Sequence, residues 1–279
     1  MRLLDTPAAT IAYDERGSGR AVVLLPSGAH TRHDFDALRA LLPDTLRTIA
    51  LDWPGHGDSP APRVRMSAMA IADVAETCVA QLAPGGAIVI GNSVGGFAAA
   101  RMAARRGELV DGLVVVDGGG FAPRSPLVLL TCALMGRPRF LRAVYPAFSS
   151  LYTRGRSDTE RRARAASIAT TRGDPGLRVV AELWRSFASP EHDLRAEAGA
   201  IRAPTLMVWG RRDPVIPLRV GRRAASIVPG ARLAVLDTGH LPHVSEPERF
   251  AQELLGFVEA IPARTPAGTA TARTRAPGH

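Results

Sequence analysis

The sequence contains no lysine, so all 35 of its basic residues are arginine. It has only two cysteines, Cys78 and Cys132, and their wide separation fits neither a metal-ligand motif nor a disulfide framework. No apolar run approaches the roughly 18 residues that a membrane-spanning helix needs. Asp5 interrupts the first apolar stretch too early for a secretory signal. These absences predict a cytoplasmic protein without a membrane segment.

The positive charge of the chain is spread along its length. The formal net charge is +9, and 46% of the residues are hydrophobic, enough for a sizeable core. Nucleic-acid-binding proteins gather their arginines on one face or helix, and this chain does not. The densest stretch, residues 137–185, holds eleven arginines and four acidic residues. We expect a solvated arginine-rich surface there, with an anionic ligand as the alternative, and we expect no nucleic-acid partner.

Short apolar runs alternate with longer amphipathic runs, which predicts a parallel α/β sheet. The predicted strands are 9–13, 21–25, 45–51, 87–90, 113–116, 205–209 and 232–236, and the predicted helices are 35–42, 68–82, 97–106 and 247–260. From about Phe121 to Ala200 the alternation gives way to a helical pattern rich in large apolar residues. The predicted division is therefore a core of 1–120 and 201–261, a helical insertion of 121–200 and a disordered tail of 262–279.

The segment Gly91-Asn92-Ser93-Val94-Gly95-Gly96 follows an apolar strand and opens a helix. A G-x-S-x-G motif in this context places a serine on a sharp strand-to-helix turn. Side chains at Gly91 and Gly95 would collide in such a turn. The N–H of Val94 lies at the helix start, where it can stabilise an oxyanion.

A serine at its ordinary pKa is a weak nucleophile and needs a base that is held by an acid. Asp213 follows the predicted strand 205–209, and His240 follows the predicted strand 232–236. The chain order is therefore Ser93, Asp213, His240, the order expected of an α/β-hydrolase.

The sequence resembles the α/β-hydrolase fold family over nearly all of residues 9–260. Four motifs in order carry the resemblance: GNSVGG, DWPGHGDSP, PTLMVWGRRDPVIP and DTGHLPHVSEP. The resemblance implies an eight-stranded, mostly parallel sheet flanked by helices, with a helical cap inserted after the sixth strand. It also implies Ser93 as nucleophile, Asp213 as acid and His240 as base.

Other residues compete for the roles of acid and base. His243 lies three positions beyond His240, and we expect it on the following loop or helical turn. Asp117 also ends a strand, a position from which some family members take the acid, and it stays the alternative acid. Asp237 is expected to shape its loop, and His56 belongs to a turn that resembles the family's structural PGHG motif.

The oxyanion hole is where the chain departs from the family pattern. Relatives commonly carry His-Gly after the strand that corresponds to 22–25, whereas this chain reads Pro26-Ser27-Gly28. Proline has no N–H to donate, so the N–H of Ser27 or of Gly28 is expected to complete the hole with that of Val94. Two histidines just beyond this loop are expected to face solvent, with the pocket mouth as the alternative: His30 and His33.

A serine at position 93 excludes the family's aspartate-nucleophile reactions and implies acyl transfer. The expected substrate is an ester, thioester or lactone of a small, mainly apolar molecule, with no metal or organic cofactor. The elbow is also similar to that of the meta-cleavage-product hydrolases, which break C–C bonds, but those enzymes usually carry tryptophan where this chain has Leu241. A ligand-binding receptor or pseudoenzyme is the alternative from another class.

Overall fold

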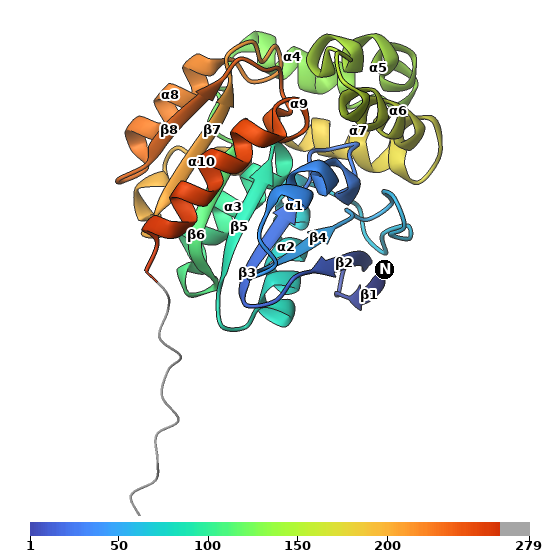
Figure 1. Cartoon of the computed structure of the whole chain (residues 1–279). Coiled ribbons are helices and arrows are strands. Elements are labelled where there is room, and N and C mark those ends of the chain that lie inside the picture. Colours follow the sequence, from blue (N-terminus) through green and yellow to red (C-terminus); the bar gives the residue numbers. More distant parts are fainter. Residues whose placement is uncertain (263–279) are drawn as a thin grey trace, which may run out of the picture.

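The computed structural model describes residues 1–262, and in this part of the chain one eight-stranded sheet forms the centre of the molecule (Figure 1). Only the first two strands run antiparallel to their neighbours; the rest are parallel. The order across the sheet is β1 (Arg2–Asp5), β2 (Thr10–Arg16), β4 (Leu46–Leu51), β3 (Arg20–Leu25), β5 (Ala87–Asn92), β6 (Val110–Val116), β7 (Thr205–Gly210) and β8 (Arg232–Leu236). The predicted mostly parallel sheet is confirmed.

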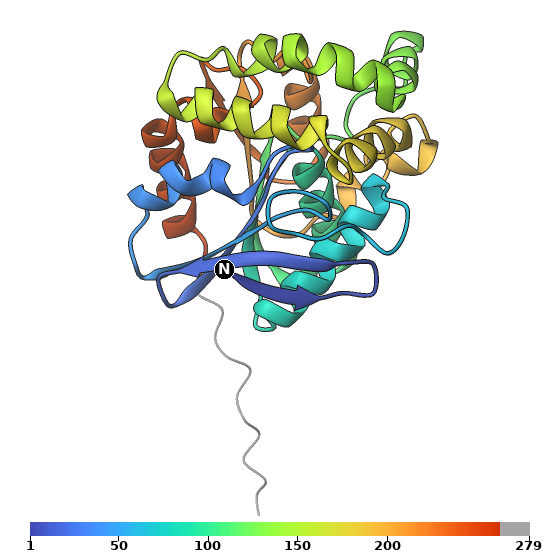
Figure 2. The same ribbon diagram turned by 90° about the vertical axis from the view of Figure 1, so that its right-hand side faces the viewer.

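Helices cover both faces of the sheet, and each layer has its own apolar core (Figures 1 and 2). Side chains of the central strand β5 alternate between the two: Val89 packs in one core, Ile88 and Ile90 in the other. A strand buried on both faces reads as a continuous apolar run, as 87–90 does. The helices are α2 (Ala68–Leu82), α3 (Val94–Arg105) and α8 (Leu218–Ile227) on one face, and α1 (Asp36–Leu41) and α10 (Pro247–Ala260) on the other.

Four helices follow β6, where the sequence predicts a helical insertion. They lie together at one end of the sheet, above its parallel strands (Figures 1 and 2). Local signals fix their starts: Ser125 caps α4, and Ser157 forms a capping box with Glu160 at the start of α6. Their bounds are α4 (Pro126–Met135), α5 (Pro138–Thr153), α6 (Asp158–Arg172) and α7 (Gly176–Ser186). Within residues 1–262, no helix combines the length and the apolar character needed to span a membrane.

Several elements differ from the sequence-based prediction. The edge strand β1 was not predicted, because it is short and mostly exposed and so carries little apolar alternation. Helix α8 was also not predicted, because it is short and contains Gly221, a poor helix former, which packs against the Trp209 ring. Helix α3 begins at Val94 rather than at 97. The predicted tail, apart from Pro262, lies outside the described residues.

The turn from β5 into α3 brings three stretches of backbone into close contact. A Cβ on Gly91 would overlap the Gly95 carbonyl, and a Cβ on Gly95 would overlap the Leu25 carbonyl at the end of β3. Neither carbonyl is at the end of a flexible side chain, so neither can move aside cheaply. The structure thus gives the physical reason for both glycines of the motif.

We predict that Gly95→Ala lowers the free energy of unfolding by about 3 kcal/mol, the upper part of the range for overpacking. Gly256→Ala is the matched control, because Gly256 lies inside α10 with no atom near its missing Cβ. That substitution should stabilise the protein by about 1 kcal/mol through helix propensity. Urea denaturation measures both values; equal effects of the two substitutions would contradict this account.

Candidate active site

Ser93 follows β5, and hydrogen bonds of its main chain fix its position. It has φ +56° and ψ −113°, a conformation that L-residues rarely adopt, and it forms the N-cap of α3. Its N–H donates to the Val116 carbonyl at 2.9 Å, and its carbonyl accepts from the N–H groups of Phe97 at 3.0 Å and Gly119 at 2.9 Å. In the described chain the Ser93 hydroxyl makes no hydrogen bond, and Ser93 lines a cavity.

Asp213 and His240 meet at the ends of β7 and β8. His240 Nδ1 lies 2.7 Å from Asp213 Oδ2, and both residues are at least 95% buried. The other oxygen, Oδ1, accepts the N–H groups of Val215 at 2.7 Å and Ile216 at 3.1 Å. Because a carboxylate only accepts hydrogen bonds, His240 carries its proton on Nδ1 and leaves Nε2 as an acceptor.

Contacts from two sides fix the main chain of His240. Its carbonyl accepts from Asn92 Nδ2 at 3.0 Å, and its N–H donates to the Tyr152 carbonyl at 3.3 Å. The Tyr152 ring packs edge-on against the imidazole, with centroids 5.8 Å apart. The histidine is therefore held by the residue before Ser93 and by the end of α5.

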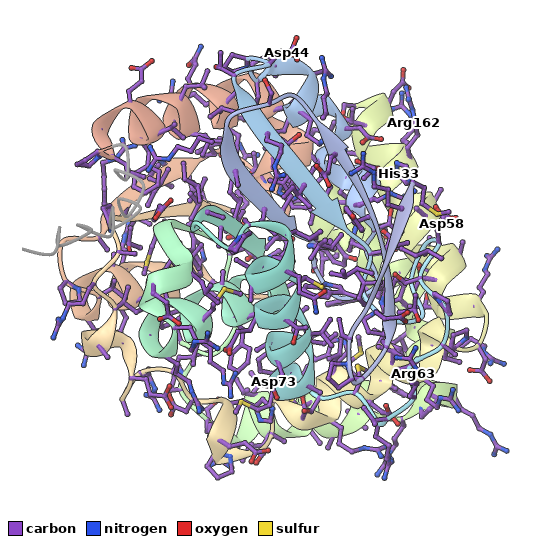
Figure 3. The ribbon with its side chains drawn as sticks, turned by 90° about the horizontal axis from the view of Figure 1, so that it is seen from below. His33, Asp44, Asp58, Arg63, Asp73 and Arg162 are labelled. Carbon is purple, nitrogen blue, oxygen red and sulfur yellow. The ribbon has the colours of Figure 1, made fainter. Side chains whose placement is uncertain are left out.

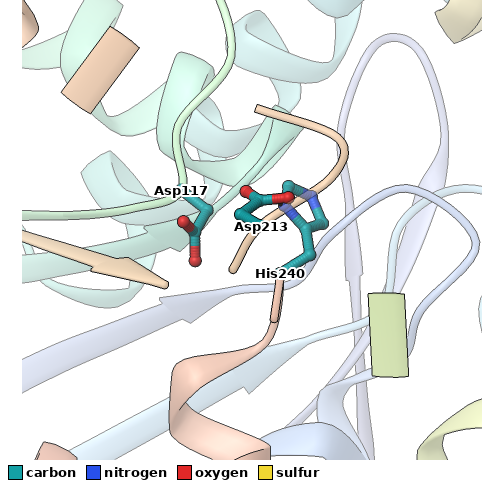
Figure 4. A group of neighbouring side chains, drawn as sticks. All are labelled: Asp117, Asp213 and His240. Carbon is teal, nitrogen blue, oxygen red and sulfur yellow. The ribbon is translucent and has the colours of Figure 1, made fainter. Parts of the chain in front are cut away.

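Asp117 lies behind this pair rather than on the histidine. Asp213 stands between Asp117 and His240 (Figure 4), and Asp117 Oδ1 accepts the Gly210 N–H at 2.9 Å. Burial, and then the charge of Asp213, raise the pKa of the Asp117 carboxyl well above its usual range. Two adjacent buried carboxylates cannot both be ionised, and Asp213 is stabilised by three hydrogen bonds. Asp117 is therefore the neutral member.

The same three residues are a candidate group for a metal ion. One ligand atom from each of Asp117, Asp213 and His240 lies within 4.8 Å of the others. The hydrogen bond from His240 Nδ1 to Asp213 and the proton on Asp117 account for this proximity without a metal ion. The donor set thus fits an acid–base pair with a neutral neighbour.

The remaining candidates from the sequence have other surroundings. His243, in the short helix α9 (Pro242–Ser245), stacks on Phe35 at 4.5 Å between centroids, and burial lowers its pKa to about 3. It is not among the residues that line the Ser93 cavity. Asp237 forms an ion pair with Arg212.

His56 fixes the loop that follows β3. Its Nδ1 lies 3.0 Å from the Pro54 carbonyl, and its Nε2 accepts the Ala29 N–H at 3.2 Å. Burial lowers the pKa of His56 to about 4, so the ring is neutral and keeps this tautomer. The Ala29 N–H is thereby occupied, whereas Ser27 and Gly28 line the cavity together with Val94 and Ser93.

His30 is fully buried, so the expectation that it faces solvent is wrong. Its Nδ1 lies 2.5 Å from Asp34 Oδ2 and its Nε2 lies 2.9 Å from the Tyr152 hydroxyl. The Tyr152 hydroxyl in turn lies 2.6 Å from that of Tyr145. These groups join the loop after β3 to α5. No sequence motif signals this network, because the pair His30 and Asp34 lies far along the chain from the pair Tyr145 and Tyr152. His33, in contrast, is exposed as expected (Figure 3).

The cavity over Ser93 has a volume of about 340 Å³. Its lining is mainly apolar and comes from both the core and α4–α7; it includes Val128, Phe148, Leu183, Trp184 and Phe187. None of the eleven arginines of 137–185 lines it. All but Arg164 of those arginines are exposed, among them Arg162 (Figure 3), as expected for a solvated surface. The arginines that do line the cavity are Arg124 and Arg219.

Residues 22–253 match the model of the alpha/beta hydrolase family, and the chain belongs to this family. It is 30% identical over 257 residues to the pimeloyl-(acyl-carrier protein) methyl ester esterase of Neisseria meningitidis serogroup B, covering 86% of this chain and 93% of the relative. It is 27% identical over 285 residues to an uncharacterized protein of Mycobacterium tuberculosis, covering 89% of this chain and 78% of the relative.

Solved structures show the same fold. A thermophilic esterase from Thermogutta terrifontis superimposes with a TM-score of 0.78 at 23% identity, covering 94% of this chain and 99% of that one. The family and fold predicted from the four motifs are thus confirmed.

We predict that Tyr152→Phe lowers the free energy of unfolding by about 1–3 kcal/mol, because it leaves the buried His30 Nε2 without a partner. Tyr13→Phe is the control, since the Tyr13 hydroxyl makes no hydrogen bond within residues 1–262. Urea denaturation of both variants measures the difference. A Tyr152→Phe protein as stable as the control would show that the network contributes nothing to stability.

We predict that Asp117→Asn keeps activity within a few-fold of the unmodified protein, because a neutral amide replaces a neutral acid. Asp213→Asn should lose about 10³–10⁴-fold in kcat/KM, as expected when the histidine loses its carboxylate partner. Steady-state kinetics on any accepted ester compare the two. A loss in Asp117→Asn as large as that in Asp213→Asn would place the charge on Asp117.

Proposed function

We propose that the protein is a serine hydrolase that cleaves an ester, thioester or lactone bond of a small, mainly apolar molecule. The observation that carries this proposal is the 2.7 Å hydrogen bond between His240 and Asp213 beside the cavity onto which Ser93 opens. Membership of the alpha/beta hydrolase family supports it. In this proposal Ser93 is the nucleophile, His240 the base and Asp213 the acid that orients it.

The reaction begins when Ser93 Oγ attacks the carbonyl carbon and His240 Nε2 takes the hydroxyl proton. In free enzymes the serine–histidine hydrogen bond is often long and shortens when substrate binds. The carbonyl oxygen becomes an oxyanion, which the Val94 N–H and the N–H of Ser27 or Gly28 stabilise. The N-terminus of α3 adds its partial positive charge at the same place.

The tetrahedral intermediate then collapses. The bond to the leaving alcohol or thiol breaks, His240 gives that group its proton, and the acyl group remains on Ser93. Water attacks the acyl carbon and gives a proton to His240. The second intermediate releases the carboxylic acid, and Ser93 recovers its proton from His240.

The substrate class follows from the cavity and from a relative. A mainly apolar lining favours an apolar substrate, and the Neisseria meningitidis relative is named as a methyl ester esterase. In this proposal α4–α7 act as a cap that shapes the cavity, because their side chains form much of its wall. The unpaired, buried cysteines Cys78 and Cys132 support a reducing cytoplasm as the location.

We predict that a fluorophosphonate probe labels the purified protein at Ser93. One adduct should be seen by intact mass, and it should disappear in Ser93→Ala. Ser189→Ala, which removes another serine of the same cavity, should keep the label. The same Ser93→Ala change should lower kcat/KM on short-chain esters by about 10³-fold or more.

The labelling and ester assays also distinguish an ester hydrolase from a ligand-binding receptor and from a C–C bond hydrolase. A folded protein that takes no label and hydrolyses no ester, but is stabilised by small ligands in a thermal shift assay, would be a receptor. Turnover of vinylogous 1,5-diketones in preference to esters would assign C–C bond cleavage instead.

A further inference from the structure

His192 is a buried histidine without a hydrogen-bond partner. It ends the short 3-10 helix Pro190–His192 between α7 and β7, and its side chain is 1% exposed. Neither ring nitrogen makes a hydrogen bond within residues 1–262, and no other residue in that range leaves two buried polar side-chain atoms unpaired. Buried polar groups are nearly always paired in folded proteins, so this exception calls for a partner from outside the chain.

The surroundings of the ring favour its neutral form. It lies against the rings of Phe97 and Phe187, with centroids 5.7 and 5.8 Å away. Burial lowers the pKa of His192, the charge of Arg101 acts in the same direction, and the charge of Glu191 and the Ser189 backbone act against them. A carboxylate oxygen of Glu191 is 3.8 Å from Nδ1, which is beyond hydrogen-bond distance. A neutral imidazole offers one N–H donor and one nitrogen acceptor.

His192 lines the same cavity as Ser93. The Phe187 ring lies between His192 and the backbone beside Ser93. It packs on His192, and its Cζ lies 3.0 Å from where a Cβ on Gly119 would be. The Gly119 N–H donates to the Ser93 carbonyl. A molecule bound in this cavity against Ser93 therefore shares its wall with His192.

Two charged residues, Asp193 and Arg124, line the cavity near His192, and both are bonded to other groups. The Asp193 carboxylate is held by Arg195, at 2.8 Å from Nε and 2.5 Å from Nη2. Arg124 is exposed and donates to the Ala188 carbonyl at 2.8 Å, which places it at the cavity rim. The buried polar surface here is thus the uncharged ring of His192.

We propose that His192 binds an uncharged hydroxyl or carbonyl group of the substrate, and so makes the enzyme selective for oxygenated esters over plain alkyl esters. A hydroxyl matches either nitrogen, and a carbonyl oxygen matches the N–H. The inference rests on the proposed hydrolase function and adds to it a substrate class: mainly apolar esters that carry one polar oxygen group away from the scissile bond.

His243 provides a matched comparison. It is also buried, its Nδ1 also lacks a partner, and it too packs against phenylalanine rings. It does not line the cavity. Replacing either histidine by phenylalanine removes an unpaired polar atom from an aromatic environment, but only the change at 192 alters the wall of the cavity.

The first experiment compares methyl esters of straight-chain C4–C8 acids with the same esters bearing one hydroxyl or oxo group at successive positions, by pH-stat. The wild type should prefer at least one oxygenated ester over its parent by about 10-fold in kcat/KM, the effect of one hydrogen bond. His192→Phe should remove that preference, so that the oxygenated ester and its parent are hydrolysed with equal kcat/KM by the variant. His192→Asn, which keeps a donor and an acceptor, should retain part of it, and His243→Phe should retain all of it.

The second experiment needs no turnover. In the Ser93→Ala background, at least one ester of the oxygenated series should raise Tm more than its parent does, and His192→Phe should abolish the difference. His192→Phe alone should raise Tm, because it removes unpaired polar atoms, whereas a histidine with a purely structural role would lower it. A wild type that hydrolyses alkyl esters without preference, or a His192→Phe variant that keeps the preference, would overturn the inference.

The proposed function is judged separately. Hydrolysis of the parent alkyl esters, lost in Ser93→Ala, tests it without reference to His192. If no ester is turned over, the proposed function fails, and the shifts in Tm still decide whether His192 binds an oxygenated ligand.

Discussion

The close approach of β3, β5 and α3 at the elbow is the constraint on which the site depends. Gly91, Gly95 and Gly96 each lie where a Cβ would come within 3 Å of a neighbouring backbone atom. This contact sets the angle at which α3 leaves the sheet and forces Ser93 into its positive φ. It also places the first turn of α3 beside the loop after β3. A single packing arrangement therefore positions Ser93, the N–H of Val94 and the loop of Ser27 and Gly28.

Electrostatics then distinguishes two acids at neighbouring strand ends. Asp213 sits in a loop whose N–H groups solvate its charge, while Asp117 accepts one N–H in a fully buried position. The difference between them arises from the backbone around each side chain. The sequence shows that Asp117 and Asp213 both follow predicted strands. The number of N–H groups that point at each carboxyl depends on how the loops fold.

The sequence predicts those parts of the fold and of the candidate site that depend on neighbouring residues in the chain. The central strands, α2, α10 and the motif positions of Ser93, Asp213 and His240 follow from apolar periodicity and from glycine spacing, which are local. The burial of His30, and the lack of a hydrogen-bond partner for His192, depend on which distant segments of the chain pack around each ring. Apolar periodicity does not indicate such contacts. The hydrogen-bond network of His30 and Tyr152, and the position of His192 at the cavity, are therefore seen only in the structure.

Tyr152 ties the end of α5 to the core. Its carbonyl accepts from the main chain of His240, while its hydroxyl is bonded to His30 in the core. Moving the end of α5 away from the core would break both contacts and free the main chain of His240. Helices grafted in place of α4–α7 would therefore need their own anchor for the loop that holds His240. They would also have to replace the hydrogen bonds from Met66 to Glu182 and from Ser245 to Glu160.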